Sequence, residues 1–192
     1  MQLIHQIWIG DEIPKELYQK TIELKQMNPE FKYKLWGNEA LEQYNLDNIP
    51  SNISKAFIVD ILRLKILHDY GGIYIDVDYE SILPLSELGS LLDADLAIYT
   101  FDTNNPLMIK YSNGFMIATV NYDFSELIDS YDILLNQPII WNLRKFLKNR
   151  NFVEIPESLV GEEGSILKDL KLRSWDASVI SRRARNKRNM NI

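Results

Sequence analysis

Residues 60–80 read DILRLKILHDYGGIYIDVDYE, and this stretch decides the expected fold. A helical pattern of apolar residues begins after Ser54, a residue type that often caps helix N-termini, and ends at Gly71-Gly72. The β-branched residues that follow, over 73–81, predict a strand. A helix joined to a strand by a two-glycine turn is typical of a layered α/β domain.

The polar residues of this stretch are expected to meet at one site. Side chains alternate along a strand, so we expect Tyr74, Asp76 and Asp78 to share one face at its carboxyl end. Ligands of open α/β sheets bind at that end. On the preceding helix, Asp60 and Arg63 are three residues apart and therefore lie on one face. Because the glycine turn is short, all five side chains could converge.

The two aspartates at the strand end suggest a metal site. Carboxylate oxygens are the ligands that Mg²⁺ and Mn²⁺ prefer, often together with substrate phosphates. The D-x-D pattern alone is weak evidence, because Asp93-Ala94-Asp95 repeats it, and we interpret that copy as a solvated turn. The capped helix, double glycine and apolar strand set the first copy apart. We therefore predict a divalent metal held by Asp76 and Asp78.

The rest of the chain extends the same architecture. Strands are expected over 2–9, 33–36, 96–101 and 115–119, with weaker candidates at 153–155 and within 165–175, and helices over 14–27, 38–45, 123–134 and 138–148. This alternation predicts an α/β fold, a Rossmann-type single domain whose largely parallel central sheet is flanked by helices. We place that domain at residues 1–181, followed by a basic C-terminal tail over 182–192.

Charge and composition limit the function classes. The chain has 192 residues, enough for one domain, and a net charge of −6. Five cations lie in RRARNKR at 182–188, so the remainder is more acidic still, which argues against a nucleic-acid partner. The tail could make a weak contact with an anionic membrane surface. The absence of cysteine excludes disulfides and thiolate metal sites and fits a cytoplasmic protein, peripheral at a membrane if the tail binds one.

The string DILRLKILHDYGGIYIDVD resembles the sugar-nucleotide-binding segment of family 32 glycosyltransferases, relatives of α-mannosyltransferases, capsular polysaccharide transferases and clostridial glucosylating toxins. IHQIWIG at 4–10 is similar to the opening strand of that family, and SNGFMIA at 112–118 is a shorter match. The resemblance implies a short form of the GT-A-like fold. It also implies metal-dependent transfer of a hexose from a nucleotide-diphosphate sugar, with a UDP-sugar expected, to a saccharide or other hydroxyl acceptor, with retention of configuration.

The resemblance implies roles for the matched residues of the donor site. Trp8 would stack on the nucleobase, and Tyr74 would line the nucleotide pocket. Asp60 and Arg63 would hold the ribose and the sugar or phosphate, since arginine suits bidentate recognition of oxygen groups. Asp76 would contact the ribose or sugar and assist the metal.

The remaining roles implied by the resemblance concern the metal and the acceptor side. Asp78 would be the principal metal ligand, so that Asp76, Asp78 and Arg63 form the catalytic set. Asn113 and Gly114 would lie near the transferred sugar or the acceptor. Ser174 and Trp175 resemble a Ser-Trp pair that lies near the phosphates in such enzymes.

The chain departs from the family in its C-terminal part. Many relatives place a histidine near the C-terminal tryptophan, but no histidine follows His68 here. A third protein metal ligand would have to be of another type, and Glu162, Glu163 and Asp176 remain open.

Two alternatives to a transferase remain. The missing histidine and small size leave room for a non-catalytic module that binds a sugar nucleotide or glycan. A phosphohydrolase of the haloacid dehalogenase type also has D-x-D at a strand end. That class expects Thr or Val where Glu80 stands, and it uses the first strand of the chain.

Overall fold

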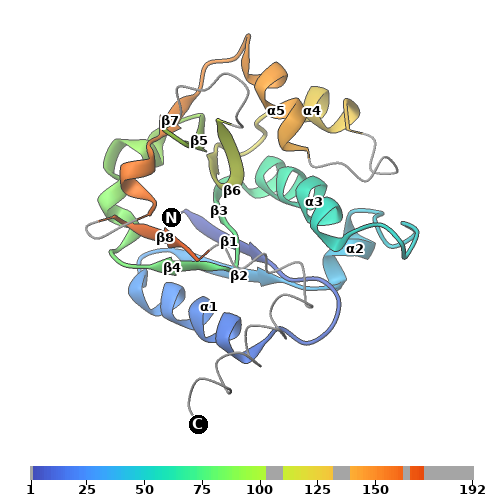
Figure 1. Ribbon diagram of the computed structural model, residues 1–192, viewed down its shortest axis with the longest axis horizontal. Helices are drawn as coiled ribbons and strands as arrows, with labels where there is room; N and C mark the ends of the chain where they lie inside the picture. The colour runs from blue at the N-terminus through green and yellow to red at the C-terminus, as the bar shows by residue number, and fades with distance from the viewer. Residues whose placement is uncertain (1, 103–109, 132–138, 162–164, 171–192) are drawn as a thin grey trace.

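The computed structural model of the chain describes residues 2–102, 110–131, 139–161 and 165–170. A six-stranded sheet in the order β2-β1-β3-β6-β5-β7 forms the centre of the molecule (Figure 1). Strand β6 is antiparallel to both of its neighbours, and the other neighbouring pairs are parallel. The predicted α/β class and largely parallel sheet are therefore confirmed. The strands of this sheet are β1 (Leu3–Ile7), β2 (Lys32–Trp36), β3 (Gly72–Ile75), β5 (Leu96–Thr100), β6 (Tyr111–Ala118) and β7 (Val153–Ile155).

Helices cover both faces of the sheet (Figure 1). On one face a core cluster joins residues of α2, α3, α4 and α5 to side chains such as Tyr74 and Met116. On the other face Leu24 of α1 and Leu88 of η1 pack with Ile73. No helix within the described ranges is long and apolar enough to cross a membrane. The helices are α1 (Lys15–Met27), α2 (Glu39–Gln43), α3 (Lys55–Tyr70), α4 (Ser125–Asp129) and α5 (Ile140–Leu147), with 3-10 helices η1 (Leu85–Asp93) and η3 (Glu157–Leu159).

The turn between α3 and β3 depends on its two glycines. Gly71 and Gly72 have φ angles of 59° and 96°, which side chains other than hydrogen rarely allow. A Cβ at Gly72 would also collide with the carbonyl oxygen of Leu3 on the neighbouring strand. The turn therefore lets β3 enter the sheet beside β1 directly after the helix ends.

The expected continuous strand over 73–81 is wrong. Strand β3 ends at Ile75, and β4 (Tyr79–Ser81) belongs to a separate two-stranded sheet with β8 (Leu167–Asp169). The chain turns between them, where the Tyr79 amide donates to the carbonyl of Asp76 at 3.2 Å. Aspartate favours turns over strands, and β8 offers a new pairing partner immediately after the turn. Strand alternation therefore places Asp76 with Tyr74 but does not extend to Asp78.

Other differences lie at element ends. The strand expected at 115–119 begins earlier, at Tyr111, and η1 was not anticipated. The helices expected over 123–134 and 138–148 are shorter, at Ser125–Asp129 and Ile140–Leu147. Asp93 is the last residue of η1 and Asp95 lies between η1 and β5; both are exposed, so this second D-x-D segment is solvated as expected.

Candidate active site

Arg63 is the centre of the polar cluster that α3, β3 and β6 bring together. The residue is only 4% exposed. One terminal nitrogen lies 3.1 Å from Oδ1 of Asp60, one helical turn earlier. The other lies 3.2 Å from Oδ1 of Asp76 and donates to the carbonyl of Asn113 at 2.5 Å. The guanidinium also lies over the ring of Tyr74, 4.5 Å from its centroid. Arg63 is thus surrounded by four other predicted site residues, whereas Asp78 is not among them.

Asp60 holds this cluster together from the buried face of α3. Its Oδ1 accepts a hydrogen bond from the Asn113 side chain at 2.7 Å, and its Oδ2 accepts one from the Ile139 amide at 3.3 Å. Burial raises the pKa of Asp60, although Arg63 and Asn113 act in the opposite direction. Both oxygens are therefore engaged inside the protein. Asp60 positions Arg63 and Asn113, and its contact with the ribose or sugar stays a prediction.

Asp76 lies one residue beyond β3, where its backbone is fixed on both sides. Its amide donates to the carbonyl of Gly114 at 2.8 Å, and its carbonyl accepts from the Gln6 side chain at 3.2 Å. Its Oδ1 accepts a 2.5 Å hydrogen bond from the hydroxyl of Tyr74. Burial raises the pKa of Tyr74 far above its usual range, and the Asp76 carboxylate acts in the same direction, whereas Arg63 acts against it. The phenol therefore keeps its proton and stays a hydrogen-bond donor. Within the described residues, Oδ2 of Asp76 makes no hydrogen bond and is the oxygen left for a ligand.

A bulge in β6 supplies the other wall of the cluster. The register with β5 shifts from Ile98 opposite Met116 to Tyr99 opposite Ser112, so residues 113–115 are unpaired with β5. Such bulges turn backbone groups away from the ladder and are frequent at functional sites. Here the bulge turns the carbonyl of Asn113 toward Arg63. A Cβ at Gly114 would lie 2.7 Å from Oδ2 of Asp76, so the glycine leaves room for that carboxylate.

Asp78 lies outside this cluster, in the segment between β3 and β4, and is 7% exposed. Its carbonyl accepts from the Leu170 amide at 3.0 Å, which ties it to the end of β8. The neighbouring Tyr79 is opposite Asp169 in the β4–β8 pair. Burial raises the pKa of Tyr79, and Asp169, Asp76 and Asp78 raise it further, so all three carboxylates lie near that ring.

The carboxylates of the D-x-D segment fit a divalent cation. Among the described residues no group of three acidic or histidine side chains is arranged to hold a metal ion. Two carboxylates, completed by substrate phosphates and water, are nevertheless a usual way to bind Mg²⁺. Asp76 offers its Oδ2, and Asp78 is two residues away. The open candidates for a third ligand, Glu162, Glu163 and Asp176, lie outside the described residues.

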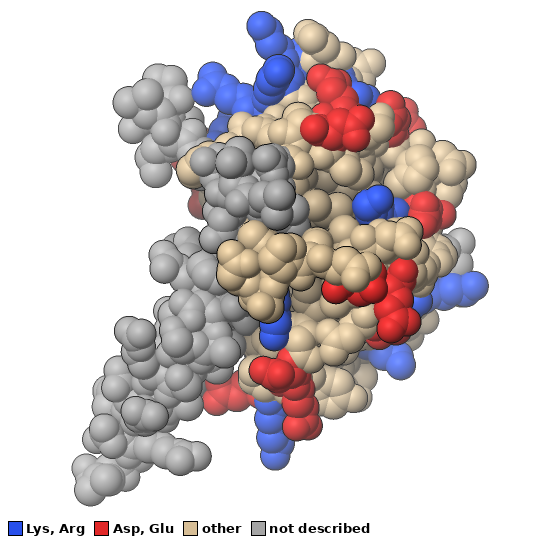
Figure 2. Space-filling model, turned by 90° about the vertical axis from the view of Figure 1, so that its right-hand side faces the viewer, with Lys and Arg blue, Asp and Glu red and all other residues tan. Residues whose placement is uncertain are grey.

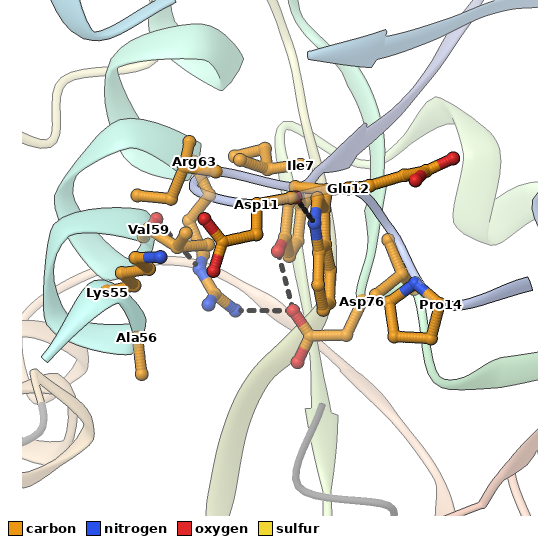
Figure 3. A pocket seen from close by; sticks show the side chains of 13 residues that line it. Ile7, Asp11, Glu12, Pro14, Lys55, Ala56, Val59, Arg63 and Asp76 are labelled. Atoms are coloured by element: carbon orange, nitrogen blue, oxygen red, sulfur yellow. Dashed lines mark hydrogen bonds and ion pairs between the residues drawn. The ribbon is translucent and has the colours of Figure 1, made fainter. Parts of the chain in front are cut away.

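A cavity of about 160 Å³ lies beside the cluster and reaches Arg63, Tyr74 and Asp76. Figure 3 shows Arg63 and Asp76 joined at one side of it, with Asp11, Glu12 and Pro14 coming from the segment after β1. Trp8 also lines it, partly exposed, with its indole nitrogen donating to the carbonyl of Asp11 at 2.7 Å. The cavity therefore combines an aromatic ring, a cation and the first aspartate of the D-x-D segment.

Residues 14–95 match the family described as "Glycosyltransferase sugar-binding region containing DXD motif". The matched stretch is less than half of the chain and is similar to that glycosyltransferase region. It contains α1, β2, the whole α3–β3 unit and both aspartates of the motif. The resemblance inferred from the sequence is thereby confirmed.

The curated relatives are glycosyltransferases from yeast and a giant virus. Inositol phosphoceramide mannosyltransferase 3 of Schizosaccharomyces pombe is 32% identical over 87 residues, which are 40% of this chain and 24% of the relative. Inositol phosphoceramide mannosyltransferase 1 of the same yeast is 27% identical over 136 residues, 64% of this chain and 40% of the relative. The uncharacterized glycosyltransferase L373 of Acanthamoeba polyphaga mimivirus is 26% identical over 130 residues, which are 62% of this chain and 50% of the relative. The chain thus spans half or less of the length of these proteins.

Solved glycosyltransferases share the fold. A glycosyltransferase involved in glycosylation of the major capsid of PBCV-1 aligns with a TM-score of 0.56 at 7% identity, covering 88% of this chain and 94% of that one. The galactosyltransferase LgtC, solved with donor and acceptor sugar analogues, aligns with a TM-score of 0.53 at 14% identity, covering 83% and 75%. The expected GT-A-like fold is confirmed.

The matched region places at the cavity a cation that was not among the predicted site residues. Lys55 lines the cavity with Val59 and Arg63, and the spacing of four residues puts all three on one face of α3 (Figure 3). The end of the Lys55 side chain packs against Gly10, whose φ is 107°. The four-residue spacing from Arg63 was a signal that could have revealed it.

Not all predicted residues meet at the cavity. Three of them lie instead in the hydrogen-bonded cluster that supports the cavity residues Arg63 and Asp76. These three are Asp60, Asn113 and Gly114. Ser174 and Trp175 lie outside the described residues. Asp169 was missed because only the pairing of β8 with β4 places it near the motif.

Proposed function

We propose that this protein transfers a hexosyl group from a nucleotide-diphosphate sugar to a hydroxyl acceptor. The observation that carries the proposal is the pairing of buried Arg63 with Asp76 of the D-x-D segment, beside a cavity that Trp8 lines. A buried cation that its partners hold in a fixed position at a cavity wall is preorganised to meet a charged group. The match of residues 14–95 to a glycosyltransferase sugar-binding region supports a sugar nucleotide as that group.

The donor would lie along the cavity with its base toward Trp8. The partly exposed indole offers a flat face for stacking, and its N–H is already bound to Asp11, which holds the ring in place. Lys55 and Arg63 place two cations along α3 for the diphosphate. The cations of this helix thus offset the acidic character of the chain at the site.

The two motif aspartates would hold the divalent cation, Mn²⁺ or Mg²⁺. When bound there, such a cation neutralises charge on the leaving nucleoside diphosphate. Tyr74 and Arg63 hold Oδ1 of Asp76, which directs Oδ2 outward. We propose Asp78 as the principal ligand and Asp76 as its assistant and as a contact of the ribose or sugar.

On the acceptor side, Asn113 and Gly114 at the β6 bulge would border the transferred sugar. The acceptor hydroxyl would attack the anomeric carbon as the bond to the diphosphate breaks, and the family resemblance favours retention of configuration. The names of the yeast relatives favour mannose as the hexose, and the sequence-based expectation of a UDP carrier stays a prediction. The assignment of residues 1–181 to one domain, and a membrane contact by the tail at 182–192, also stay predictions.

Calorimetric titration with a panel of UDP- and GDP-sugars, in the presence of Mn²⁺, tests the proposal. We expect one donor to bind only with the metal, and Asp78→Asn to weaken that binding on the order of a hundredfold or more, above the loss typical of an outer-shell residue. Asp93→Asn is the matched control, because Asp93 belongs to the second D-x-D segment and is exposed at the end of η1. It should bind the donor like the unchanged protein.

Three outcomes would contradict the proposal. Equal donor binding by Asp78→Asn would refute the metal assignment. Tight donor binding without release of the nucleoside diphosphate on any acceptor would favour a non-catalytic binding module. Release of inorganic phosphate from phosphate esters, without donor binding, would favour a phosphohydrolase.

A further inference from the structure

The segment around α5 concentrates positive charge in an acidic chain. Residues 140–153 read IWNLRKFLKNRNFV and contain four cations and no acidic residue, whereas the whole chain has a net charge of −6. The positive charge is therefore local to this segment, since the chain as a whole is acidic. It suggests a partner of opposite charge at this end of the molecule.

The exposed side of α5 combines these cations with an aromatic ring. Leu143, Phe146 and Leu147 are buried against the core, and the opposite side of the helix faces solvent. We call the four exposed residues of that side, Trp141, Arg144, Lys145 and Lys148, the α5 face. Trp141 is 57% exposed, the largest exposed fraction among the exposed large hydrophobic side chains of the described residues.

The two lysines of the α5 face, Lys145 and Lys148, carry the charge on which docking depends. Lys145 and Lys148 make no ion pair within the part of the chain that the structure describes. Arg150 by contrast pairs with Glu126 at 3.2 Å and lies over the ring of Phe146, so we do not count it in the face. Figure 2 shows Lys and Arg side chains gathered and projecting outward at the end of the molecule where α5 lies.

We propose that the α5 face docks on the surface of an anionic lipid bilayer. Exposed lysines that project outward match an array of lipid phosphates, each lysine contributing roughly 1 kcal/mol near the surface. Tryptophan prefers the membrane–water interface, because its ring is apolar and its N–H remains hydrated. The acidic body of the chain, apart from the basic tail at 182–192, is repelled by the same surface, which favours an orientation with the α5 face toward the lipid.

Docking through α5 would bear directly on the candidate active site. The helix begins one residue after Ile139, whose amide is bound by Asp60 of the Arg63 cluster. A docked α5 therefore holds that cluster at a set height above the lipid headgroups. The docking goes beyond the proposed transfer reaction, and only its use in presenting a lipid-linked acceptor rests on that reaction.

Cosedimentation of the full chain with vesicles tests the proposal. We expect binding to phosphatidylcholine vesicles that contain phosphatidylserine, weaker binding at high salt, and no binding to phosphatidylcholine alone. Lys145→Gln with Lys148→Gln should weaken the partition about thirtyfold, roughly fivefold for each lysine. Trp141→Ala should weaken it as well. Lys15→Gln with Lys25→Gln, which removes the same charge from exposed positions of α1, should leave binding unchanged.

Equal binding to both kinds of vesicle, or an equal loss in the α1 and α5 variants, would overturn the proposal. It would also fail if soluble polygalacturonate bound the chain as tightly as the vesicles at the same salt concentration, because the partner would then be an acidic glycan. Thermal unfolding checks that the variants, all at exposed positions, are folded. Donor titration of the same variants should match the unchanged protein, so failure of docking is separable from failure of the proposed function.

Discussion

Arg63 shows how a single buried residue organises the candidate site. Burial alone lowers the pKa of a guanidinium, but Asp76, Tyr74 and Asp60 together raise the pKa of Arg63, so it stays charged. A buried charge without partners is strongly destabilising, and each donor of Arg63 that points inward has an acceptor. The partners that offset the free-energy cost of burying Arg63 are therefore also groups that the site must hold in fixed positions.

Gly114→Ala tests whether the space beside Asp76 matters. The added methyl group would lie 2.7 Å from Oδ2 of Asp76 and 3.1 Å from the hydroxyl of Tyr79, so the carboxylate must move. The carboxylate is the end of a flexible side chain, so we expect stability to fall by only about 1 kcal/mol. Metal-dependent donor affinity should fall by about tenfold or more, because an orienting geometry is lost. Calorimetry and urea unfolding measure the two effects.

Gly161→Ala is the control for this substitution. Among the described residues, a Cβ there would approach only the carbonyl of Glu157, at an ordinary 3.6 Å. Donor affinity should be unchanged in this variant. If both alanine variants bound the donor like the unchanged protein, the space beside Asp76 would not be a requirement of the site.

At the scale of elements, two local irregularities build the site. The glycine turn brings β3 beside β1 at the end of α3, and the β6 bulge turns Asn113 and Gly114 toward it. Arg63 on α3, Asp76 after β3 and the bulge are thereby within hydrogen-bond distance of one another. With a regular turn and a regular strand, these groups of three different elements would not be brought within hydrogen-bond distance.

Gly72→Ala tests the turn. The substitution adds a side chain at a φ of 96° and drives it into the carbonyl of Leu3 on β1. Gly89→Ala adds a side chain at a φ of 54° where no atom of the described residues lies within 4 Å, so it carries the backbone strain without the collision. We expect Gly72→Ala to lower the free energy of unfolding by about 2 kcal/mol more than Gly89→Ala. Equal losses in urea unfolding would show that the contact with β1 is not what the glycine serves.

At the scale of the whole molecule, His5 joins three parts of the fold. It is fully buried on β1, its Nε2 lies 2.8 Å from the carbonyl of Gly71, and its Nδ1 accepts from the indole of Trp36 at 3.0 Å. Burial lowers the pKa of His5 to about 4. The hydrogen bond to the Gly71 carbonyl raises this pKa, and the charge of Lys34 lowers it. The neutral ring is therefore part of the folded state.

Stability should fall with acid because of His5. The unfolded chain takes up the proton near pH 6.5 and the folded chain only near pH 4, so the contribution is complete above 6.5 and is lost as the pH falls toward 4. The loss is about 3 kcal/mol at most. Urea unfolding across this range should show the decline, and His5→Gln should remove that part of it. The same substitution at exposed His68 should leave the decline intact. If stability declined as much in His5→Gln as in the unchanged protein, the assignment to His5 would be wrong.

The sequence by itself determined the features that depend on neighbouring residues. Helical spacing joined Asp60 to Arg63, and strand alternation joined Tyr74 to Asp76, because both periods are set by local backbone geometry. The double glycine marked the turn between them, since few other residues reach its φ values. The α/β class and the glycosyltransferase resemblance followed from this one unit.

Only the tertiary structure decided where the remaining groups of the site lie. The end of β3 before Asp78 depends on β8, some 90 residues later, and the β6 bulge is defined by its register with β5. The anchoring of Asp60 by Ile139 and the place of Asp169 likewise depend on distant segments. Strand order and register follow from the packing of the whole chain, and no local pattern specifies them. The D-x-D segment was therefore visible in the sequence, while its surroundings were decided by the fold.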